Sequence, residues 1–201
     1  MRPTKPKMIS GGTAETPVVA CRPPNTSALI APDGSIAATY RKIHLFDVAV
    51  DHGPVDTESA RVSPGDVPVV AEVDGVTVGL SVCYDLRFPE LYRTLALAGA
   101  EVLTVPSNFT ERTGRDHWEV LLRARAIENG AWVLAPGQSG GPPGQPAFGR
   151  SMVIDPWGTV VAQAPDGVGI VRADVETDRV AAVRRQIPSL ANRQSNTYRL
   201  G

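Results

Sequence analysis

The sequence of 201 residues has no excess of charge of either sign. Lysine and arginine total 20, and aspartate and glutamate total 21, which gives a formal net charge of -1 at pH 7. A protein that binds the phosphates of nucleic acid or an anionic membrane surface through its charge needs basic residues in excess. We therefore expect no nucleic acid and no membrane among its partners.

Long apolar runs and cysteines are also scarce. No run of apolar residues approaches the roughly 20 positions that a helix needs to cross a bilayer. The basic segment 1–7 is not followed by the apolar core of a secretory signal. There are two cysteines, Cys21 and Cys83, and a domain of this size does not need a disulfide. We therefore expect reduced thiols and a cytoplasmic protein.

The remaining composition is that of a folded domain. Hydrophobic residues make up 42% of the chain and the mean hydropathy is -0.08, values that exclude a disordered chain. The length suits one domain with a sizeable core. Glycine and proline, at 19 and 18 residues, predict many loops.

Residue patterns predict a mixture of strands and helices. Apolar residues alternate from 76 to 82, which predicts a strand that ends near Cys83. A proline suits the first turn of a helix over 89–98, and Asp116 can cap a second helix over 117–129. Further strands are expected at 26–31, 35–40, 67–73, 101–105, 131–135, 152–154, 159–162 and 168–173, and a last helix at 177–186. Hairpins combined with βα units predict an α/β layered sandwich with a mixed sheet.

Cys83 lies where the alternating strand ends, a few residues before a helix begins. A strand–turn–helix junction exposes a side chain at the carboxyl edge of a sheet, where backbone N–H groups point at the same space. This position suits a nucleophile. A buried core cysteine is the alternative, because cysteine is among the most buried residue types.

Four ordered blocks resemble motifs of the nitrilase superfamily of carbon–nitrogen hydrolases. They are YRKIHLFD at 40–47, GLSVCYDLRFPELY at 79–92, HWEVLLRARAIEN at 117–129 and GRSMVIDPWG at 149–158. The resemblance extends from about residue 9 to about residue 193 and is strongest to amidases of deaminated glutathione and of omega-amides of 2-oxo acids. It implies a nitrilase-type α-β-β-α sandwich with a mixed sheet, a small amide as substrate, and neither a metal nor an organic cofactor.

The resemblance also implies roles for five residues. Cys83 matches the nucleophile, and Lys42 matches a lysine that donates a proton and stabilises the tetrahedral intermediate. Glu119 matches a glutamate that holds this lysine, the N–H of Tyr84 matches part of the oxyanion hole, and Asn108 joins the oxyanion or substrate-binding set. The chemistry is consistent, because an ammonium lowers the pKa of a nearby thiol and a buried ammonium needs a carboxylate.

Ordinary structural roles remain open for the same residues. Lys42 follows Arg41, and two adjacent cations are usually a solvated surface pair. Glu119 could form a surface salt bridge with Arg123, four residues later on the same helix. A metal site is an alternative for the histidines and aspartates of 44–52, but no cysteine or helical histidine spacing supports one.

The resemblance implies one more glutamate, a general base located before the lysine motif. Glu15 is the only glutamate before Lys42, and it aligns outside the catalytic set. We therefore expect an N-terminally incomplete domain that lacks its first βαβ portion and hydrolyses amides poorly. The expected divisions are a disordered leader at 1–8, the hydrolase domain at 9–195 and a C-terminal tail at 196–201.

The sequence therefore predicts a hydrolase that cleaves a non-peptide C–N bond of a small linear amide through a Cys83 thioester and releases ammonia. One alternative is a catalytically impaired scaffold or binding subunit with the same fold. Another is an acyltransferase or amidotransferase that uses the same thioester. The resemblance also implies a homo-oligomer that pairs through helices such as 89–98 and 117–129.

Overall fold

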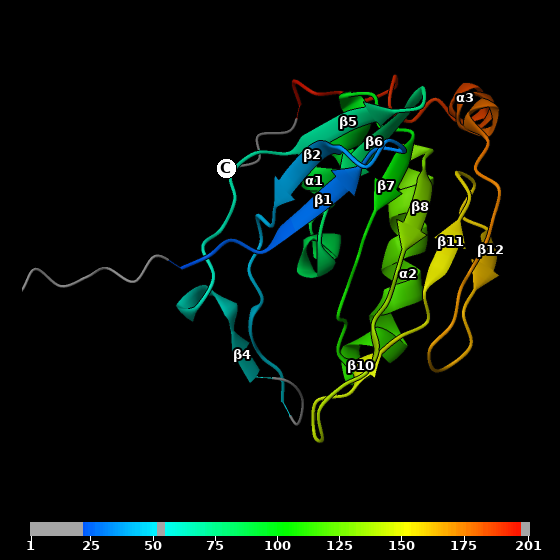
Figure 1. Ribbon diagram of the computed structural model, residues 1–201. Coiled ribbons are helices and arrows are strands. Elements are labelled where there is room, and N and C mark those ends of the chain that lie inside the picture. The colour runs from blue at the N-terminus through cyan, green and yellow to red at the C-terminus, as the bar shows by residue number, and fades with distance from the viewer. Residues whose placement is uncertain (1–21, 52–54, 198–201) are drawn as a thin grey trace, which may run out of the picture.

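A six-stranded mixed sheet forms the centre of the molecule, in the strand order β12-β11-β8-β7-β6-β5 (Figure 1). The computed structural model describes residues 22–51 and 55–197. Strands β6, β7 and β8 are parallel, and the pairs at both ends of the sheet are antiparallel. The bounds are β5 Val69–Val73, β6 Val76–Leu80, β7 Val102–Thr104, β8 Trp132–Ala135, β11 Met152–Ile154 and β12 Val160–Gln163. The predicted mixed sheet is confirmed.

Two helices make the crossovers that parallel strands require. Helix α1 (Pro89–Leu97) joins β6 to β7, and α2 (Glu111–Asn129) joins β7 to β8. Helix α1 packs on β6, and α2 packs on β8 and β11. Gly79 of β6 allows this close approach, because a Cβ there would lie 3.1 Å from the Cβ atoms of Leu95 and Ala100. A third helix, α3 (Thr177–Gln186), has the bounds that the sequence predicts.

A separate antiparallel hairpin lies beside β5 of the six-stranded sheet (Figure 1). It consists of β1 (Thr26–Ile30) and β2 (Ile36–Arg41). Its turn and that of the β5–β6 hairpin fall where the sequence predicts. In the latter, Asp74 and Gly75 have φ angles of 51° and 75°, as a type I′ turn requires. Shorter elements are β3 Asp47–Ala49, β4 Val55–Thr57, β9 Ser139–Gly140, β10 Ala147–Phe148, and the 3-10 helices η1 Glu58–Ala60 and η2 Cys83–Arg87.

Two expectations about elements are wrong. Helix α2 begins at Glu111 rather than at residue 117, because Thr110 already has the extended backbone of an N-cap and Asp116 lies inside the helix. Residues 168–173 form no strand, since no described strand pairs with them, and Val168 and Ile170 are 101% and 90% exposed. The expected leader at 1–8 and residues 198–201 of the tail lie outside the described residues, and the domain limits remain a prediction. Within the described part of the chain, no helix is long and apolar enough to span a membrane.

Candidate active site

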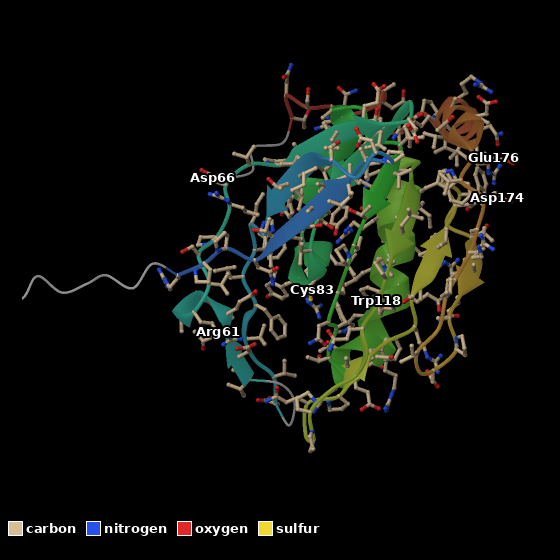
Figure 2. All side chains as sticks on the ribbon, in the orientation of Figure 1. Arg61, Asp66, Cys83, Trp118, Asp174 and Glu176 are labelled. Atoms are coloured by element: carbon tan, nitrogen blue, oxygen red, sulfur yellow. The ribbon has the colours of Figure 1, made fainter. Side chains whose placement is uncertain are left out.

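The chain turns sharply at Cys83, the first residue of η2, three residues after the end of β6. Its φ angle of 51° is in the left-handed region, which costs free energy for a residue with a side chain. The Cys83 N–H donates to Pro106 O at 3.0 Å, and the Sγ atom lies 3.7 Å from Asn108 O. The thiol therefore lies at the carboxyl ends of the neighbouring parallel strands β6 and β7, between the segment of Arg61 and helix α2 (Figure 2).

Lys42 follows β2 and is only 2% exposed. Its ammonium forms an ion pair with Glu58, a residue of η1 that is 7% exposed. The Glu58 carboxylate also accepts hydrogen bonds from Phe46 N–H at 2.7 Å and Asn25 Nδ2 at 3.2 Å. Burial raises the pKa of Glu58, but these hydrogen bonds, led by that from Lys42, outweigh it and leave the pKa below its ordinary value.

The charge of Lys42 acts on the nucleophile. Burial is the largest influence on the Cys83 thiol and raises its pKa. The Lys42 ammonium acts in the opposite direction, as does the hydrogen bond to Asn108 O, whereas the carboxylates of Glu58 and Asp85 add to the rise. The net pKa lies above its ordinary value, so the resting sulfur is a thiol at neutral pH. The expected effect of the lysine is present, but burial exceeds it.

The structure corrects the role of Glu119. Lys42 pairs with Glu58, while Glu119 Oε1 lies 3.6 Å from Nη1 of Arg123 on the same helix, with both side chains 49% exposed. The assignment of Glu119 as the partner of Lys42 is wrong because α2 turns that position toward solvent. Glu58 and Glu72 are the two glutamates between Lys42 and Cys83, and Glu72 occupies an exposed position of β5. No residue pattern in the sequence marks Glu58 rather than another glutamate as the partner of Lys42.

Tyr84 and Asn108 lie beside the thiol. The N–H of Tyr84 is in the first turn of η2, where a helix leaves its amides without an intrahelical acceptor. Asn108 lines two pockets, and so do Phe46 and Thr110. The narrow one, of about 20 Å³, adjoins the nucleophile. Its lining residues are Phe46, Cys83, Tyr84, Arg87, Asn108, Phe109, Thr110 and Thr113.

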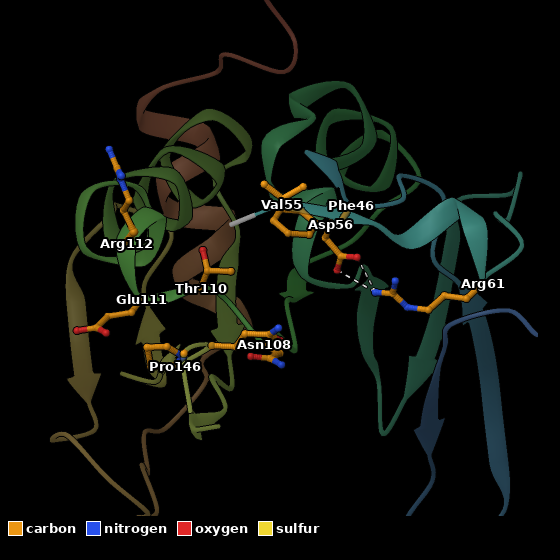
Figure 3. A pocket seen from close by; sticks show the side chains of 11 residues that line it. Phe46, Val55, Asp56, Arg61, Asn108, Thr110, Glu111, Arg112 and Pro146 are labelled. Atoms are coloured by element: carbon orange, nitrogen blue, oxygen red, sulfur yellow. Dashed lines mark hydrogen bonds and ion pairs between the residues drawn. The ribbon is translucent and has the colours of Figure 1, made fainter. Parts of the chain in front are cut away.

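The second pocket is open and has a volume of about 750 Å³. Figure 3 shows Asp56 and Arg61 on one wall and the beginning of α2, with Glu111 and Arg112, on the other. Both Asp56 oxygens lie 2.8 Å from Arg61 Nη2. The narrow and the wide pocket are neighbours, because Phe46, Asn108 and Thr110 line both.

The described residues contain no group of three or more His, Cys, Asp or Glu side chains that could hold a metal ion. His44, part of the segment considered for a metal, has its Nδ1 atom 2.7 Å from Asp85 Oδ1. His52 lies outside the described residues.

The family described as carbon-nitrogen hydrolase matches residues 5–185 of this sequence. The chain belongs to the carbon–nitrogen hydrolase family. It is 50% identical over 172 residues to the deaminated glutathione amidase of Synechocystis sp., covering 84% of this chain and 63% of that relative. The crystal structure of the Caenorhabditis elegans NitFhit protein superimposes with a TM-score of 0.83 and 41% identity, covering 92% of this chain and 45% of that one.

A third comparison concerns the Nesterenkonia sp. AN1 amidase, which is 29% identical with a TM-score of 0.70 and covers 86% of this chain and 59% of that one. The structure of one of its variants shows the acetamide moiety of fluoroacetamide added covalently at the active-site cysteine. These solved structures share the nitrilase-type fold that the sequence predicts. The carbon–nitrogen hydrolase chain spans less than two thirds of the length of each of these relatives.

Proposed function

We propose that this carbon–nitrogen hydrolase cleaves the C–N bond of a small linear amide through a thioester at Cys83. The observation that carries the proposal is the buried Lys42–Glu58 pair, whose ammonium charge acts on a cysteine held at a strained turn. The covalent adduct at the active-site cysteine of the Nesterenkonia amidase supports the same role for Cys83.

The chemistry has two halves. The Cys83 thiolate attacks the amide carbonyl carbon and forms a C–S bond, and the oxyanion faces Lys42 and the N–H of Tyr84. The tetrahedral intermediate collapses as the C–N bond breaks and the Lys42 ammonium gives a proton to the leaving nitrogen. Water then attacks the thioester carbonyl and the C–S bond breaks. The acyl group leaves as a carboxylate, and the two protons of the water molecule return to Cys83 and Lys42.

The thiol proton must leave before the first attack. Glu58 and Asp85 act on the thiol through their charge, but each already accepts three or more hydrogen bonds. We therefore propose that acylation of this chain follows the small thiolate fraction. Its rate then increases about tenfold per pH unit through the neutral range, because the thiolate is the nucleophile.

Arg87 suggests the chemistry of the acyl group. It lines the narrow pocket with Cys83, and its guanidinium carbon lies 5.8 Å from the ring centre of Tyr84 and 5.3 Å from that of Phe109. A guanidinium held between aromatic rings binds carboxylates with well-defined geometry. We propose that the substrate has a carboxylate at the end of its acyl chain, as amides of dicarboxylic acids do.

The wide pocket allows a leaving group larger than ammonia. Synechocystis sp. contains a relative named for deaminated glutathione, whose amide nitrogen belongs to a dipeptide. A pocket of about 750 Å³ that shares Asn108 and Thr110 with the narrow one has room for such a group. The released product is then an amine from a substituted amide and ammonia from a simple one.

The test uses the 201-residue chain with Cys21→Ser, so that Cys83 is its single cysteine. Deaminated glutathione, 2-oxoglutaramate and succinamate are added at pH 7 to 9.5, and the intact mass, the free acid and the released amine or ammonia are measured. We expect an acyl adduct on the Cys83 peptide, absent in Cys83→Ala and much reduced in Lys42→Met. Amine release that does not need Cys83, or the absence of both adduct and amine across this pH range, contradicts the proposal.

The same experiment distinguishes the rival functions. The raised pKa of the Cys83 thiol favours a binding subunit with impaired turnover as the second candidate. Such a subunit binds the amide, as calorimetry would show, without forming an adduct. A transferase forms the adduct but gives product only when an amine acceptor such as hydroxylamine is added.

We further propose that the chain forms a homo-oligomer through the outer face of α2. Val120 and Ile127 are 67% and 52% exposed and lie seven residues apart, hence on one face of the helix. The cytoplasm remains the proposed location, because a nucleophilic thiol needs a reducing compartment.

A further inference from the structure

Asp85 is a completely buried carboxylate within η2, two residues after the nucleophile. Its Oδ2 atom accepts hydrogen bonds from the Tyr40 hydroxyl at 2.8 Å and from Val82 N–H at 2.9 Å. Its Oδ1 atom accepts from His44 N–H at 3.1 Å and lies 2.7 Å from His44 Nδ1. Burying a charge is costly, and here four polar contacts offset the cost in place of a lysine or arginine.

These contacts come from two distant parts of the sequence. Tyr40 and His44 lie two residues before and two residues after Lys42, whereas Val82 directly precedes Cys83. The Tyr40 hydroxyl also accepts a hydrogen bond from Ile43 N–H at 3.2 Å. One carboxylate therefore holds both sides of the lysine segment against the nucleophile turn.

The lysine segment has a further contact with the same turn. The ring of His44 stacks on that of Phe88 with centroids 3.6 Å apart and an interplanar angle of 7°. Phe88 follows η2 directly, so His44 is fixed by both Asp85 and the residue that ends the turn. The backbone of Lys42 is therefore anchored on both sides, while the ion pair with Glu58 holds its ammonium.

We propose that Asp85 is a positioning residue that sets the place of the Lys42 ammonium relative to the Cys83 thiol by joining the lysine segment to the nucleophile turn. The inference rests on the proposed function, because it assigns the geometry that makes Lys42 act on Cys83. Asp85 itself does not touch the reacting atoms.

The charge of Asp85 and its positioning role predict opposite shifts of the Cys83 pKa when Asp85 is replaced. As a charge alone, Asp85 raises the pKa of the Cys83 thiol, so its removal should lower that pKa. As a positioning residue it keeps Lys42 close, so its removal should raise the thiol pKa and slow alkylation. The other charged or titratable groups that act on this thiol are Lys42 and Glu58, with the buried hydroxyl of Tyr92 nearby.

The experiment measures alkylation of Cys83 by iodoacetamide between pH 7 and 10.5, in the 201-residue chain with Cys21→Ser. We expect Asp85→Asn to raise the thiol pKa by about one unit, which slows alkylation about tenfold at neutral pH. Asp155→Asn is the matched control. Asp155 is a buried carboxylate that accepts from Trp157 N–H, Thr159 N–H and Arg179, and its loss should lower the melting temperature without changing the Cys83 titration.

A double-mutant cycle with Lys42→Met separates positioning from charge. With no ammonium left to position, Asp85→Asn should lower the Cys83 pKa, the reverse of its effect beside Lys42. An unchanged or lowered pKa in the Asp85→Asn single variant overturns the inference. If that variant fails to fold, Tyr40→Phe removes one of the four contacts and should shift the pKa in the same upward direction, and no shift there overturns the inference too.

This outcome is separable from that of the proposed function. If the wild-type chain forms no acyl adduct with any amide, the proposed function is contradicted. The alkylation data still show whether Asp85 positions Lys42. Conversely, an acyl adduct on Cys83 supports the proposed function. If the Cys83 pKa is unshifted in Asp85→Asn, the positioning role of Asp85 is contradicted.

Discussion

Lys42 and Glu58 are so deeply buried that neither charge can be solvated when the other is removed. Among single residues, they therefore couple stability to chemistry most directly. The same ammonium that needs Glu58 for its own stability lowers the pKa of the Cys83 thiol. A change at Glu58 should consequently affect both the free energy of unfolding and the reactivity of the cysteine.

We predict that Glu58→Gln lowers the free energy of unfolding by about 3–5 kcal/mol, the cost of leaving one member of a buried ion pair unpaired. It should also raise the Cys83 pKa, because an unpaired buried ammonium is less stable in its charged form and the Lys42 charge influences the thiol more than the opposing Glu58 charge does. Glu119→Gln is the matched control. Its carboxylate is half-exposed beside Arg123, so the change should cost less than about 1 kcal/mol and leave the thiol titration as it is. Urea denaturation and iodoacetamide titration of both variants check this, and equal effects of the two would contradict the structure.

Arg87 is the second residue whose role can be measured. If its guanidinium binds the carboxylate of the substrate, Arg87→Ala should lower kcat/KM for succinamate about 10- to 100-fold, since a hydrogen bond to a charged group contributes about 1.5–3 kcal/mol. Butyramide, the amide of the same chain length without the carboxylate, should react equally with both proteins. Parallel losses on the two amides would mean that Arg87 supports the turn around Cys83 and not the substrate.

For single residues, the sequence predicts a role where the residue type and its surrounding motif indicate the chemistry. The strand end and the flanking motif identify Cys83, and Lys42 belongs to a recognisable motif. The partner of Lys42 has no such signature, because any glutamate that the fold brings near can serve. Glu58 lies in η1, and the fold of the segment between Lys42 and η1 brings the two side chains together. Only the three-dimensional structure shows this proximity.

Helices and strands show the same division between local and tertiary signals. Alternation and turn residues suffice for β5, β6 and the β1–β2 hairpin, and a proline marks the start of α1. The beginning of α2 is missed because Gly114 and Thr113 have low helix propensity, and tertiary packing overrides that weak preference. Residues 168–173 have a strand-like pattern, but a strand needs a neighbour to pair with.

Gly114 is the residue of α2 at which packing and propensity conflict most clearly. A Cβ there would lie 2.4 Å from Cβ and Cγ of Phe148 in β10. Alanine gains about 1 kcal/mol over glycine in a helix interior, but overpacking costs about 1–3 kcal/mol. We therefore predict that Gly114→Ala lowers the melting temperature. Asp116→Ala, on the exposed side of the same helix, is the control and should leave the melting temperature equal or slightly higher, and a stabilised Gly114→Ala protein would show that β10 does not pack there.

For the molecule as a whole, the proposed homo-oligomer predicts a change in mass. Val120→Lys places a charge on the exposed apolar face of α2 and should shift the population toward monomers, as light scattering coupled to gel filtration would show. Val161→Lys is the control, because Val161 is 45% exposed on β12, an edge strand of the sheet and not part of α2. The proposal that α2 forms the interface is contradicted if the wild-type chain is monomeric at micromolar concentration. It is also contradicted if both variants have equal masses.

The stability of the whole molecule should also fall in acid, for a reason located at Glu58. The pKa of Glu58 lies below its ordinary value of 4.5, so the unfolded chain binds a proton that the folded chain does not. The stabilisation is complete above the pKa of the unfolded state and is lost as the pH falls through the lower, folded pKa. We predict that the free energy of unfolding decreases below about pH 4.5 and that Glu58→Gln removes up to about 1.4 kcal/mol per pH unit of that slope.

The measurement is urea denaturation followed by circular dichroism at intervals from pH 3 to 6. Lys42→Met tests the same linkage from the other side, because the hydrogen bond from Lys42 is the main contact that lowers the Glu58 pKa. Without it, burial raises the Glu58 pKa and no ammonium opposes the rise. The decrease of the free energy of unfolding in acid should therefore weaken or reverse. If both variants keep the wild-type slope, the acid lability originates in other carboxylates, and the Lys42–Glu58 pair is more accessible to water in solution than its burial indicates.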